Sequence, residues 1–278
     1  MAVTEQVAVG TIGTLSPDDA AAGLALSTEA QWNQNEADWL FFLNRARVFG
    51  ARDRNGRVVA SAALLPYSLS DAWISMVLVT ASWRRRGLAT RLVDTCLDTA
   101  GKLGLTCWLD ATPAGAAVYG PLGFVPTIET RRLRREAGGA SSSNGKLPSG
   151  DLDALIARDR QSMGFDRAKL LRELGGRTGS RCVAKDGAMA LIRDGRTARH
   201  IGPLYANDSA RALTLIRDIA AHEREPLLID AVATHDEFLN GLTGSGWTIE
   251  RPFQRMRFGQ PHTQGTELPF AVAGPEYG

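Results

Sequence analysis

Hydrophobic and polar positions follow two different periods along the first half of the chain. Residues 73–79 form a short apolar run with β-branched side chains, which is typical of a buried strand. From Leu88 to Ala100 the apolar residues recur at helical spacing and mark one face. Residues 106–111 and 123–133 predict two further strands, separated by a short helix that Pro113 opens.

The segment before residue 73 extends this order of elements. Residues 15–19 predict a helix start with a polar cap. Residues 47–52 and 57–65 predict two strands of a hairpin, because the Asn-Gly pair between them favours a tight turn. Residues 10–135 therefore run strand, helices, hairpin, strand, helix, strand, helix, strand, which indicates an α/β domain with a mixed sheet.

The second half repeats the architecture of the first. Residues 137–150 are rich in Gly and Ser and predict a flexible linker, or alternatively a long loop within one domain. After it come helices starting at Asp151 and near Arg167, a strand at 199–206, a capped helix at 207–220, a strand at 227–231, a short helix at 235–242 and a strand at 253–258. We expect two tandem domains, 1–136 and 151–260, followed by a weakly ordered tail at 261–278.

Composition narrows the function classes. The chain has 278 residues and a formal charge of +2, so nothing suggests a nucleic-acid partner. Cys96, Cys107 and Cys182 make neither a disulfide framework nor metal-type spacing, so we expect reduced core thiols and no metal. No apolar run is long enough to span a membrane and no signal peptide is present, which favours the cytoplasm.

A basic turn separates the strand at 73–79 from the helix that follows. It reads Arg84-Arg-Arg-Gly-Leu-Ala-Thr90, and Gly87 allows the backbone to approach a ligand closely. The first amides of the helix have no partner within it, so the turn can bind phosphate. Neither the nucleoside-triphosphate loop nor the dinucleotide fingerprint is present. The alternative is a solvated cationic helix start.

Two motifs resemble the GNAT-type N-acetyltransferases. The first, Arg84-x-x-Gly87-x-Ala89, is similar to the turn with which that family holds the pyrophosphate of coenzyme A. The second runs from Leu109-Asp-Ala-x-Pro113 to Tyr119-x-x-x-Gly123-Phe124 and looks like the second half of the GNAT core. Together with Gly164-Phe-Asp-Arg-x-x-Leu-Leu171, Gly202-Pro-Leu-x-Ala206 and Arg255-Met-x-Phe-Gly259, these motifs are similar to those of a bacterial family of tandem GNAT proteins. We expect the second domain to be GNAT-like without a coenzyme A site of its own. Here that domain carries Asn207-Asp208 where a pyrophosphate turn would lie.

This resemblance implies roles for particular residues. Tyr119 would protonate the departing thiolate, and the amide of Leu78 would polarise the thioester carbonyl. The implied coenzyme A contacts are the backbone of Val77, Leu78 and Val79 along the pantetheine arm, and Arg84, Arg85, Arg86, Gly87, Leu88, Ala89 and Thr90 around the pyrophosphate. The alternative for Tyr119 is a half-buried aromatic whose hydroxyl binds backbone.

Several assignments stay open at this level. Asp110 either contacts the acceptor or caps the helix at Pro113. Candidates for the general base are Glu36, Asp38, Asp71 and Asp110. The second domain either closes the acceptor cleft, with Tyr205 or Asp230 contributing, or serves dimerisation, so the protein is a monomer or a homodimer.

The resemblance implies transfer of an acetyl group from acetyl-CoA to a primary amine of a small molecule or a protein, by direct attack in a ternary complex. One alternative is a non-catalytic acyl-CoA sensor. Another is transfer of a different acyl group such as succinyl, which the arginines among residues 131–135 could pair.

Overall fold

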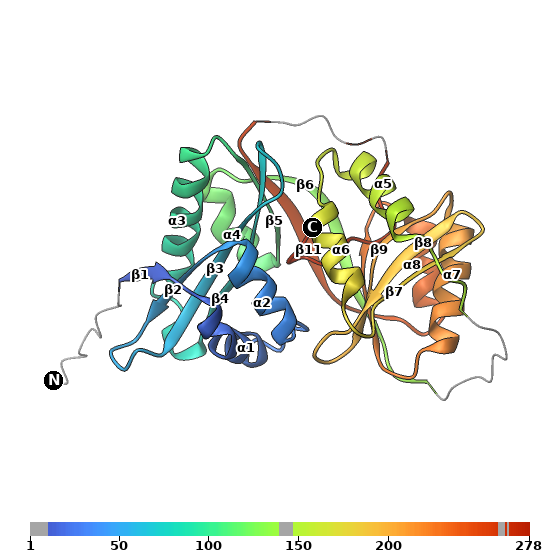
Figure 1. The fold of residues 1–278 in the computed structure, drawn as a ribbon, viewed down its shortest axis with the longest axis horizontal. Coiled ribbons are helices and arrows are strands. Elements are labelled where there is room, and N and C mark those ends of the chain that lie inside the picture. The colour runs from blue at the N-terminus through green and yellow to red at the C-terminus, as the bar shows by residue number, and fades with distance from the viewer. Residues whose placement is uncertain (1–10, 139–146, 261–264, 266) are drawn as a thin grey trace. The chain divides into compact units, whose positions relative to one another are not determined.

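The computed structural model describes residues 11–138, 147–260, 265 and 267–278. It contains two compact units (Figure 1). The first comprises the chain up to Pro66 together with residues 74–103, and the second comprises residues 67–73 and 104–278. The division passes through strand β4 (Asp71–Val79), so each unit holds one part of that strand.

The first unit is an antiparallel arrangement covered by helices. Strand β2 (Arg47–Arg52) pairs with β1 (Ile12–Thr14) on one side and with β3 (Val58–Pro66) on the other. The hairpin turns at Gly56, whose φ of 79° needs glycine, and this confirms the predicted Asn-Gly turn.

All residues of β3 except the last are buried, because helices pack on it. The helices of this unit are α1 (Ala20–Glu29), α2 (Glu36–Arg45) and α3 (Leu88–Lys102), with 3-10 turns η1 (Pro17–Asp19) and η2 (Ala81–Trp83). Both α1 and α3 contact β3. The buried side of α3 carries the predicted apolar positions Leu88, Leu92, Val93, Cys96 and Ala100.

The second unit is built on a mixed sheet with the order β4-β5-β11-β6-β10-β9-β8-β7. Its strands are β5 (Thr106–Ala111), β6 (Val125–Arg135), β7 (Arg181–Lys185), β8 (Ala188–Arg193), β9 (Arg199–Tyr205), β10 (Leu227–Val232) and β11 (Thr248–Phe258). The β4/β5 and β9/β10 pairs are parallel and the other pairs are antiparallel. Its helices are α4 (Pro113–Tyr119), η3 (Gly120–Leu122), α5 (Leu152–Met163), α6 (Ala168–Gly176), α7 (Ser209–His222) and α8 (Asp236–Thr243).

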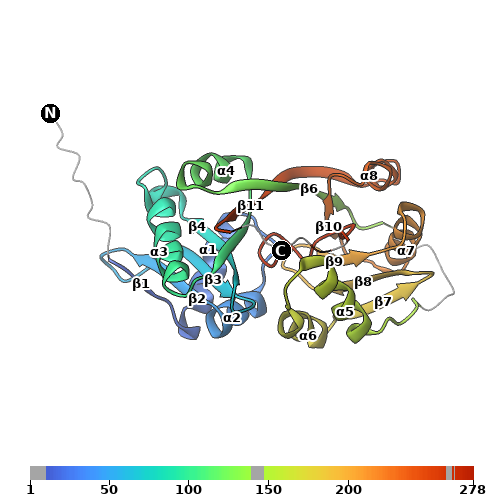
Figure 2. The same cartoon turned by 90° about the horizontal axis from the view of Figure 1, so that it is seen from above.

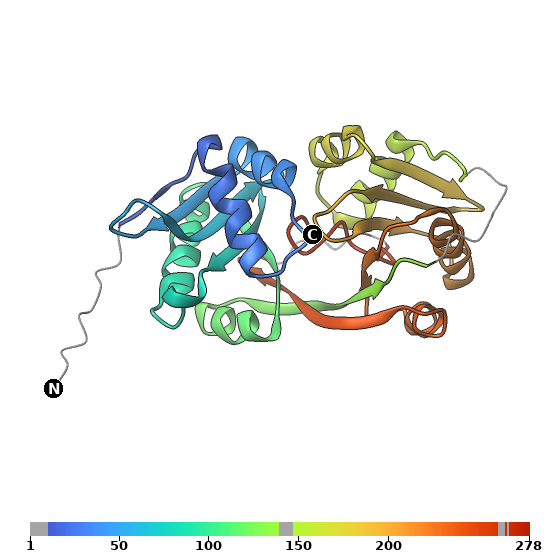
Figure 3. The same ribbon diagram turned by 90° about the horizontal axis from the view of Figure 1, so that it is seen from below.

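The last strands of the two halves are interleaved in this sheet. Strand β11, from the second half, lies between β5 and β6 of the first, and β6 lies between β11 and β10. The long pairing of β6 with β11 is visible from above and from below (Figures 2 and 3). Sequence neighbours such as β5 and β6 often pair directly, and here they do not. The division into domains 1–136 and 151–260 stays a prediction, since residues 139–146 of the linker lie outside the described part.

The prediction of a weakly ordered tail is wrong for residues 267–278. Phe270 and Ala271 belong to the apolar core around β9 and β10. The Ala271 carbonyl accepts from the Leu204 amide at 2.9 Å, and the Phe270 carbonyl accepts from Val232 at 3.0 Å. The tail composition suggested a loop, but the run 270–273 is apolar and gains both burial and hydrogen bonds. Residues 261–264 and 266 lie outside the described part.

Candidate active site

The basic turn of the first unit forms an open helix N-terminus. Gly87 is the N-cap of α3 with a φ of 73°, and no side chain of the described residues caps this helix. The first backbone bond of the helix runs from the Arg91 amide to the Gly87 carbonyl at 3.0 Å. A Cβ at Gly87 would meet no atom within 4 Å, so this face of the turn is open. The amides of Leu88 to Thr90 are thus free to bind an anion.

Three exposed arginines surround this helix start. The Arg84 Nε donates to the Val79 carbonyl at 3.0 Å, which ties its side chain to the end of β4. The Arg86 guanidinium donates to the Ser82 carbonyl and lies 4.9 Å from the centre of the Trp83 ring. Arg85 has a positive φ of 59°. The turn therefore concentrates positive charge where the helix dipole is also positive.

The strand that leads into the turn is locally irregular. Met76, just before Val77, Leu78 and Val79, has a φ of 53°, which a non-glycine residue in a strand seldom adopts. The Ser61 hydroxyl donates to the Met76 carbonyl at 2.8 Å and supports this conformation. Like a β-bulge, an irregularity at this point changes the direction in which the amides and carbonyls of residues 77–79 point.

Glu29 at the end of α1 fixes the chain where β4 passes into η2. Its carboxylate accepts from the Thr80 hydroxyl and from the Ala81 amide, each at 2.5 Å. These hydrogen bonds, led by that from Thr80, lower the pKa of Glu29 below its ordinary value. No local sequence pattern predicts this contact, because Glu29 and Thr80 are 51 residues apart in the chain.

Tyr119 and Asp110 belong to the second unit. Tyr119 is the last residue of α4, is 9% exposed, and packs against Phe124 with ring centres 6.0 Å apart. The alternative that Asp110 caps α4 is wrong, since the Thr112 hydroxyl accepts from the Gly115 amide at 3.2 Å.

Asp110 instead forms a bidentate ion pair with Arg255 on β11. Its two carboxylate oxygens accept from Nε and Nη2 at 2.8 and 2.9 Å. The two residues are directly opposite each other in the β5/β11 register. Burial raises the pKa of Asp110, and the charge and hydrogen bonds of Arg255 oppose that rise.

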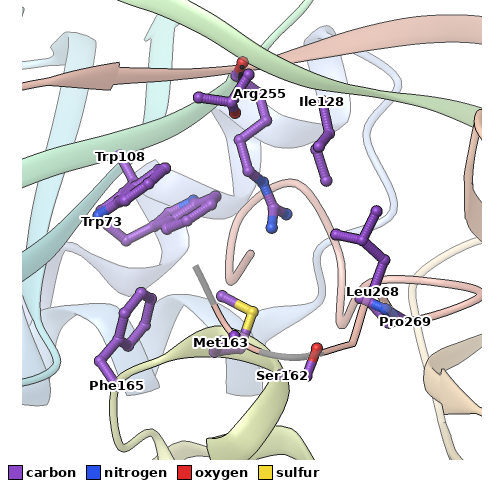
Figure 4. Close-up of a pocket in the computed structure, with 11 residues that line it drawn as sticks. Trp73, Trp108, Ile128, Ser162, Met163, Phe165, Arg255, Leu268 and Pro269 are labelled. Carbon is purple, nitrogen blue, oxygen red and sulfur yellow. Dashed lines mark hydrogen bonds between the residues drawn. The ribbon is translucent and has the colours of Figure 1, made fainter. Parts of the chain in front are cut away.

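Aromatic residues and Arg255 line a pocket of the second unit (Figure 4). Trp73 and Trp108, adjacent in the β4/β5 register, form one wall. The Trp108 indole donates to Asp71 at 3.0 Å and the Trp73 indole donates to the Pro275 carbonyl at 3.0 Å, so both rings are fixed. Sequence reasoning missed this pocket, because it depends on β11 lying beside β5.

Two of the three remaining acidic candidates, Asp38 and Asp71, have structural roles. Asp38 is buried in a capping box with Asn35 at the start of α2. Asp71 is buried and accepts from Trp108 and from two serines. Glu36 is an exposed residue in the first turn of α2. None of these contacts marks a general base.

Tyr205 and Asp230 are both fully buried and neither lines the pocket beside Arg255, so their contribution to an acceptor cleft stays a prediction. The Tyr205 hydroxyl donates to Asp159 at 2.8 Å. Asp230 pairs with Arg132 through two hydrogen bonds of 2.8 Å and contacts His200 at 2.9 Å.

The helix of the second half that corresponds to α3 is closed. Asp208 caps α7, and its carboxylate accepts from the Arg211 amide at 2.8 Å. This backbone hydrogen bond lowers the pKa of Asp208 and holds a negative charge at the helix start. The two halves therefore differ at the position where an anion would bind.

The described residues contain no group of three or more His, Cys, Asp or Glu that could hold a metal ion. Within the same ranges, no helix has the length and apolar character required to cross a bilayer.

Family comparisons match both halves of the chain. The model of the acetyltransferase (GNAT) family matches residues 14–124, and a second acetyltransferase (GNAT) domain model matches residues 155–268. The chain belongs to the GNAT acetyltransferase family. It carries two GNAT domains in tandem and is an acyltransferase.

Individual relatives extend over most of this GNAT protein. The N-acetyltransferase YitH of Bacillus subtilis, described as uncharacterized, is 24% identical over 81% of this chain and 83% of its own. A crystal structure from Pyrococcus horikoshii, named as a candidate acetyltransferase, superposes on this chain with a TM-score of 0.79 at 18% identity. The match covers 100% of this chain and 98% of that one. A tandem GNAT protein from the clavulanic acid biosynthesis pathway has a TM-score of 0.63 at 14% identity, covering 91% and 99%. These two structural likenesses support the fold.

The predicted site residues are thus distributed over both units of the GNAT protein. The first unit holds Val77 to Val79 and the turn from Arg84 to Thr90. The second unit holds Tyr119 and Asp110. Their assignment as catalytic and coenzyme A-binding residues remains a prediction.

Proposed function

We propose that this GNAT protein transfers an acetyl group from acetyl-CoA to a primary amine. The observation that carries the proposal is the open helix start at Gly87. It combines amides without a side-chain cap, an open face in front of the glycine and three arginines. These features suit a pyrophosphate, which needs hydrogen-bond donors and positive charge together.

The same features fit coenzyme A residue by residue. The amides of Leu88, Ala89 and Thr90 would bind the pyrophosphate oxygens, and Arg85, which is exposed beside them, would add charge. The backbone of Val77 to Val79 would hold the pantetheine arm as an added strand would be held. Acetyl-CoA, when bound, supplies an acetyl group activated as a thioester.

Two groups of the chain would then assist the transfer. The Leu78 amide would donate a hydrogen bond to the carbonyl oxygen on which negative charge develops. Tyr119 would hold a proton at its phenolic oxygen and give it to the sulfur that leaves. A phenol is protonated at neutral pH, and a thiolate of pKa about 8.5 accepts its proton as the bond to carbon breaks.

The amine must be neutral to attack the carbonyl. An amine of pKa about 10.4 is neutral in roughly one part in 2,500 at pH 7, which corresponds to about 4.6 kcal/mol. Asp110 is buried and paired with Arg255, so it is not placed to take this proton from the amine. We propose that the amine loses its proton to solvent, and that the rate therefore rises with pH below the pKa of the acceptor.

Only the first half would bind the cosubstrate. In the second half, the Asp208 carboxylate already occupies the helix start and would repel a pyrophosphate. We accordingly propose one acetyl-CoA per chain, and we keep the cytoplasm as the proposed location.

The test is an acceptor screen with acetyl-CoA in which released thiol is measured, using the parent chain and Tyr119→Phe. We expect turnover with at least one amine, and a loss of about 100-fold in kcat for the variant with cofactor binding retained. An acyl-CoA sensor would instead bind the cofactor and show no turnover with any amine.

A further inference from the structure

The pocket beside Arg255 has walls that are mostly apolar. Trp73 and Trp108 form one side, Met163 and Phe165 another, and Ile128 and Leu268 face them (Figure 4). All of these residues belong to the second unit. The pocket is therefore a feature of one compact body, made from strands β4, β5 and β6 of the first half and from α5, β11 and loop residues of the second.

Arg255 places a polar group inside this apolar surround. It is only 6% exposed, and Figure 4 shows its guanidinium directed into the space between the walls. Its Nε and Nη2 donate to Asp110, which leaves the edge formed by Nη1 and the second hydrogen of Nη2. No described residue accepts a hydrogen bond from Nη1.

The orientation of this free edge is fixed by two contacts. The bidentate bond to Asp110 holds the guanidinium in one plane, and the Trp73 ring lies against it with a separation of 4.7 Å. Two parallel N–H groups in a fixed plane match the two oxygens of a carboxylate. Because Arg255 is only 6% exposed, a ligand oxygen at this edge would form a charge-assisted hydrogen bond in surroundings with little water, where such a bond is stronger than at the surface.

The size of the pocket limits the carbon skeleton that the ligand's carboxylate can carry. Its volume is about 60 Å³. A cavity that encloses one benzene molecule measures roughly 150 Å³, so this pocket cannot enclose a whole aromatic ring. It can enclose a carboxylate and the first methylenes of a straight chain, which suit walls of Trp, Met and Leu, while the rest of the chain extends out of its open side.

We propose that this pocket binds a straight aliphatic chain ending in a carboxylate, which Arg255 holds through its free edge. The acceptor class is then an ω-amino carboxylate, whose amine lies at the end of the chain opposite the carboxylate. The part concerning the amine rests on the proposed acetyl transfer, whereas the binding of the carboxylated chain does not.

Calorimetry on the full chain tests the binding without acetyl-CoA. Hexanoate, hexanamide and hexylamine serve as probes, since they share one chain and differ in the terminal group. We expect hexanoate to bind about 10-fold or more tightly than hexanamide, because a charge-assisted bidentate bond is stronger than a neutral one. Hexylamine should not bind measurably. Equal affinities of hexanoate and hexylamine would overturn the proposal.

Two pairs of variants separate the pocket from general effects on the fold. Arg255→Lys keeps the charge beside Asp110 but loses the planar fork, so hexanoate should bind about 10- to 100-fold more weakly. Its control is Arg257→Lys on the same strand, which changes an arginine that lies 5.8 Å from the Trp108 ring but does not line the pocket. Ile128→Trp should fill the pocket and abolish binding, and the exposed Ile249→Trp should not.

If Arg255→Lys fails to fold, the Ile128→Trp and Ile249→Trp pair decides the matter alone. Unchanged hexanoate binding in Ile128→Trp would contradict the proposal.

Transfer assays with 6-aminohexanoate, 6-aminohexanamide and hexylamine complete the design. Faster acetylation of 6-aminohexanoate, lost in Ile128→Trp, supports both proposals. Hexanoate binding without acetylation of any amine would support the pocket and contradict the transferase. Equal acetylation of all three amines, or transfer to protein lysines alone, would support the transferase and overturn the assignment of the pocket as the acceptor site.

Discussion

The Asp110–Arg255 pair joins the last strand of the second half to a strand of the first. Its side chains are 0% and 7% exposed, and two charge-assisted hydrogen bonds of 2.8 and 2.9 Å connect them. At about 1.5–3 kcal/mol for each such bond, their loss amounts to about 3–6 kcal/mol. Removing one partner of a buried pair costs about 3–5 kcal/mol, because the other charge stays buried. We therefore expect Asp110→Asn to lower the free energy of unfolding by about 3–5 kcal/mol.

Asp153→Asn is the matched control, since Asp153 pairs with Arg172 at 3.0 Å while both side chains are mostly exposed. That change should cost less than about 1 kcal/mol. Urea denaturation followed by tryptophan fluorescence measures both. The double variant Asp110→Asn with Arg255→Gln should be less destabilised than the sum of the two single changes. Equal, small effects of Asp110→Asn and Asp153→Asn would refute the reasoning.

Three further predictions concern the turn, the acid and the response to pH. Gly87→Ala should weaken acetyl-CoA binding about 10-fold or more. The control is Gly56→Ala, because Gly56 has a similar φ of 79° and equally open surroundings. It should lose about 1 kcal/mol of stability through backbone strain and bind acetyl-CoA normally. Tyr119→Phe should leave the calorimetric Kd for acetyl-CoA within about 2-fold of the parent value while kcat falls about 100-fold, and a parallel rise in Kd would contradict its role as an acid. Burial, assisted by Arg193, lowers the pKa of His200, so His200 stabilises the fold above the unfolded value of about 6.5 and this contribution is lost as the pH falls below it. The unfolding free energy should therefore change little between pH 7.5 and 6.5, and should fall by up to about 1.4 kcal/mol between pH 6.5 and 5.5. A fall of the same size in His200→Gln would contradict the assignment.

Local signals in the sequence predicted the local structure of the candidate site. The strand at β4, the glycine turn and the amphipathic helix α3 follow one another within thirty-two residues, from Asp71 to Lys102, and each depends on near neighbours in the chain. The cap of α4 could also have been assigned, because Thr112 directly precedes the N1 proline Pro113. Asp110 lies too early for that role.

Long-range pairing could not be predicted in the same way. Nothing in the spacing of residues 248–258 indicates that β11 inserts between β5 and β6. Any strand edge offers the same backbone amides and carbonyls, so the pattern of one strand does not identify its partners. Arg255 and its pocket depend on that insertion. The burial of residues 267–278 was hidden for a related reason, because Pro and Gly in the tail suggested a loop while its partners lie in β9 and β10.

Titration of acetyl-CoA into the full chain by calorimetry tests the central claim most directly. The open start of α3 and the closed start of α7 together predict a stoichiometry of one per chain, with the heat reduced in Gly87→Ala and retained in Gly56→Ala. No heat with the parent chain, or two equivalents bound, would contradict the account.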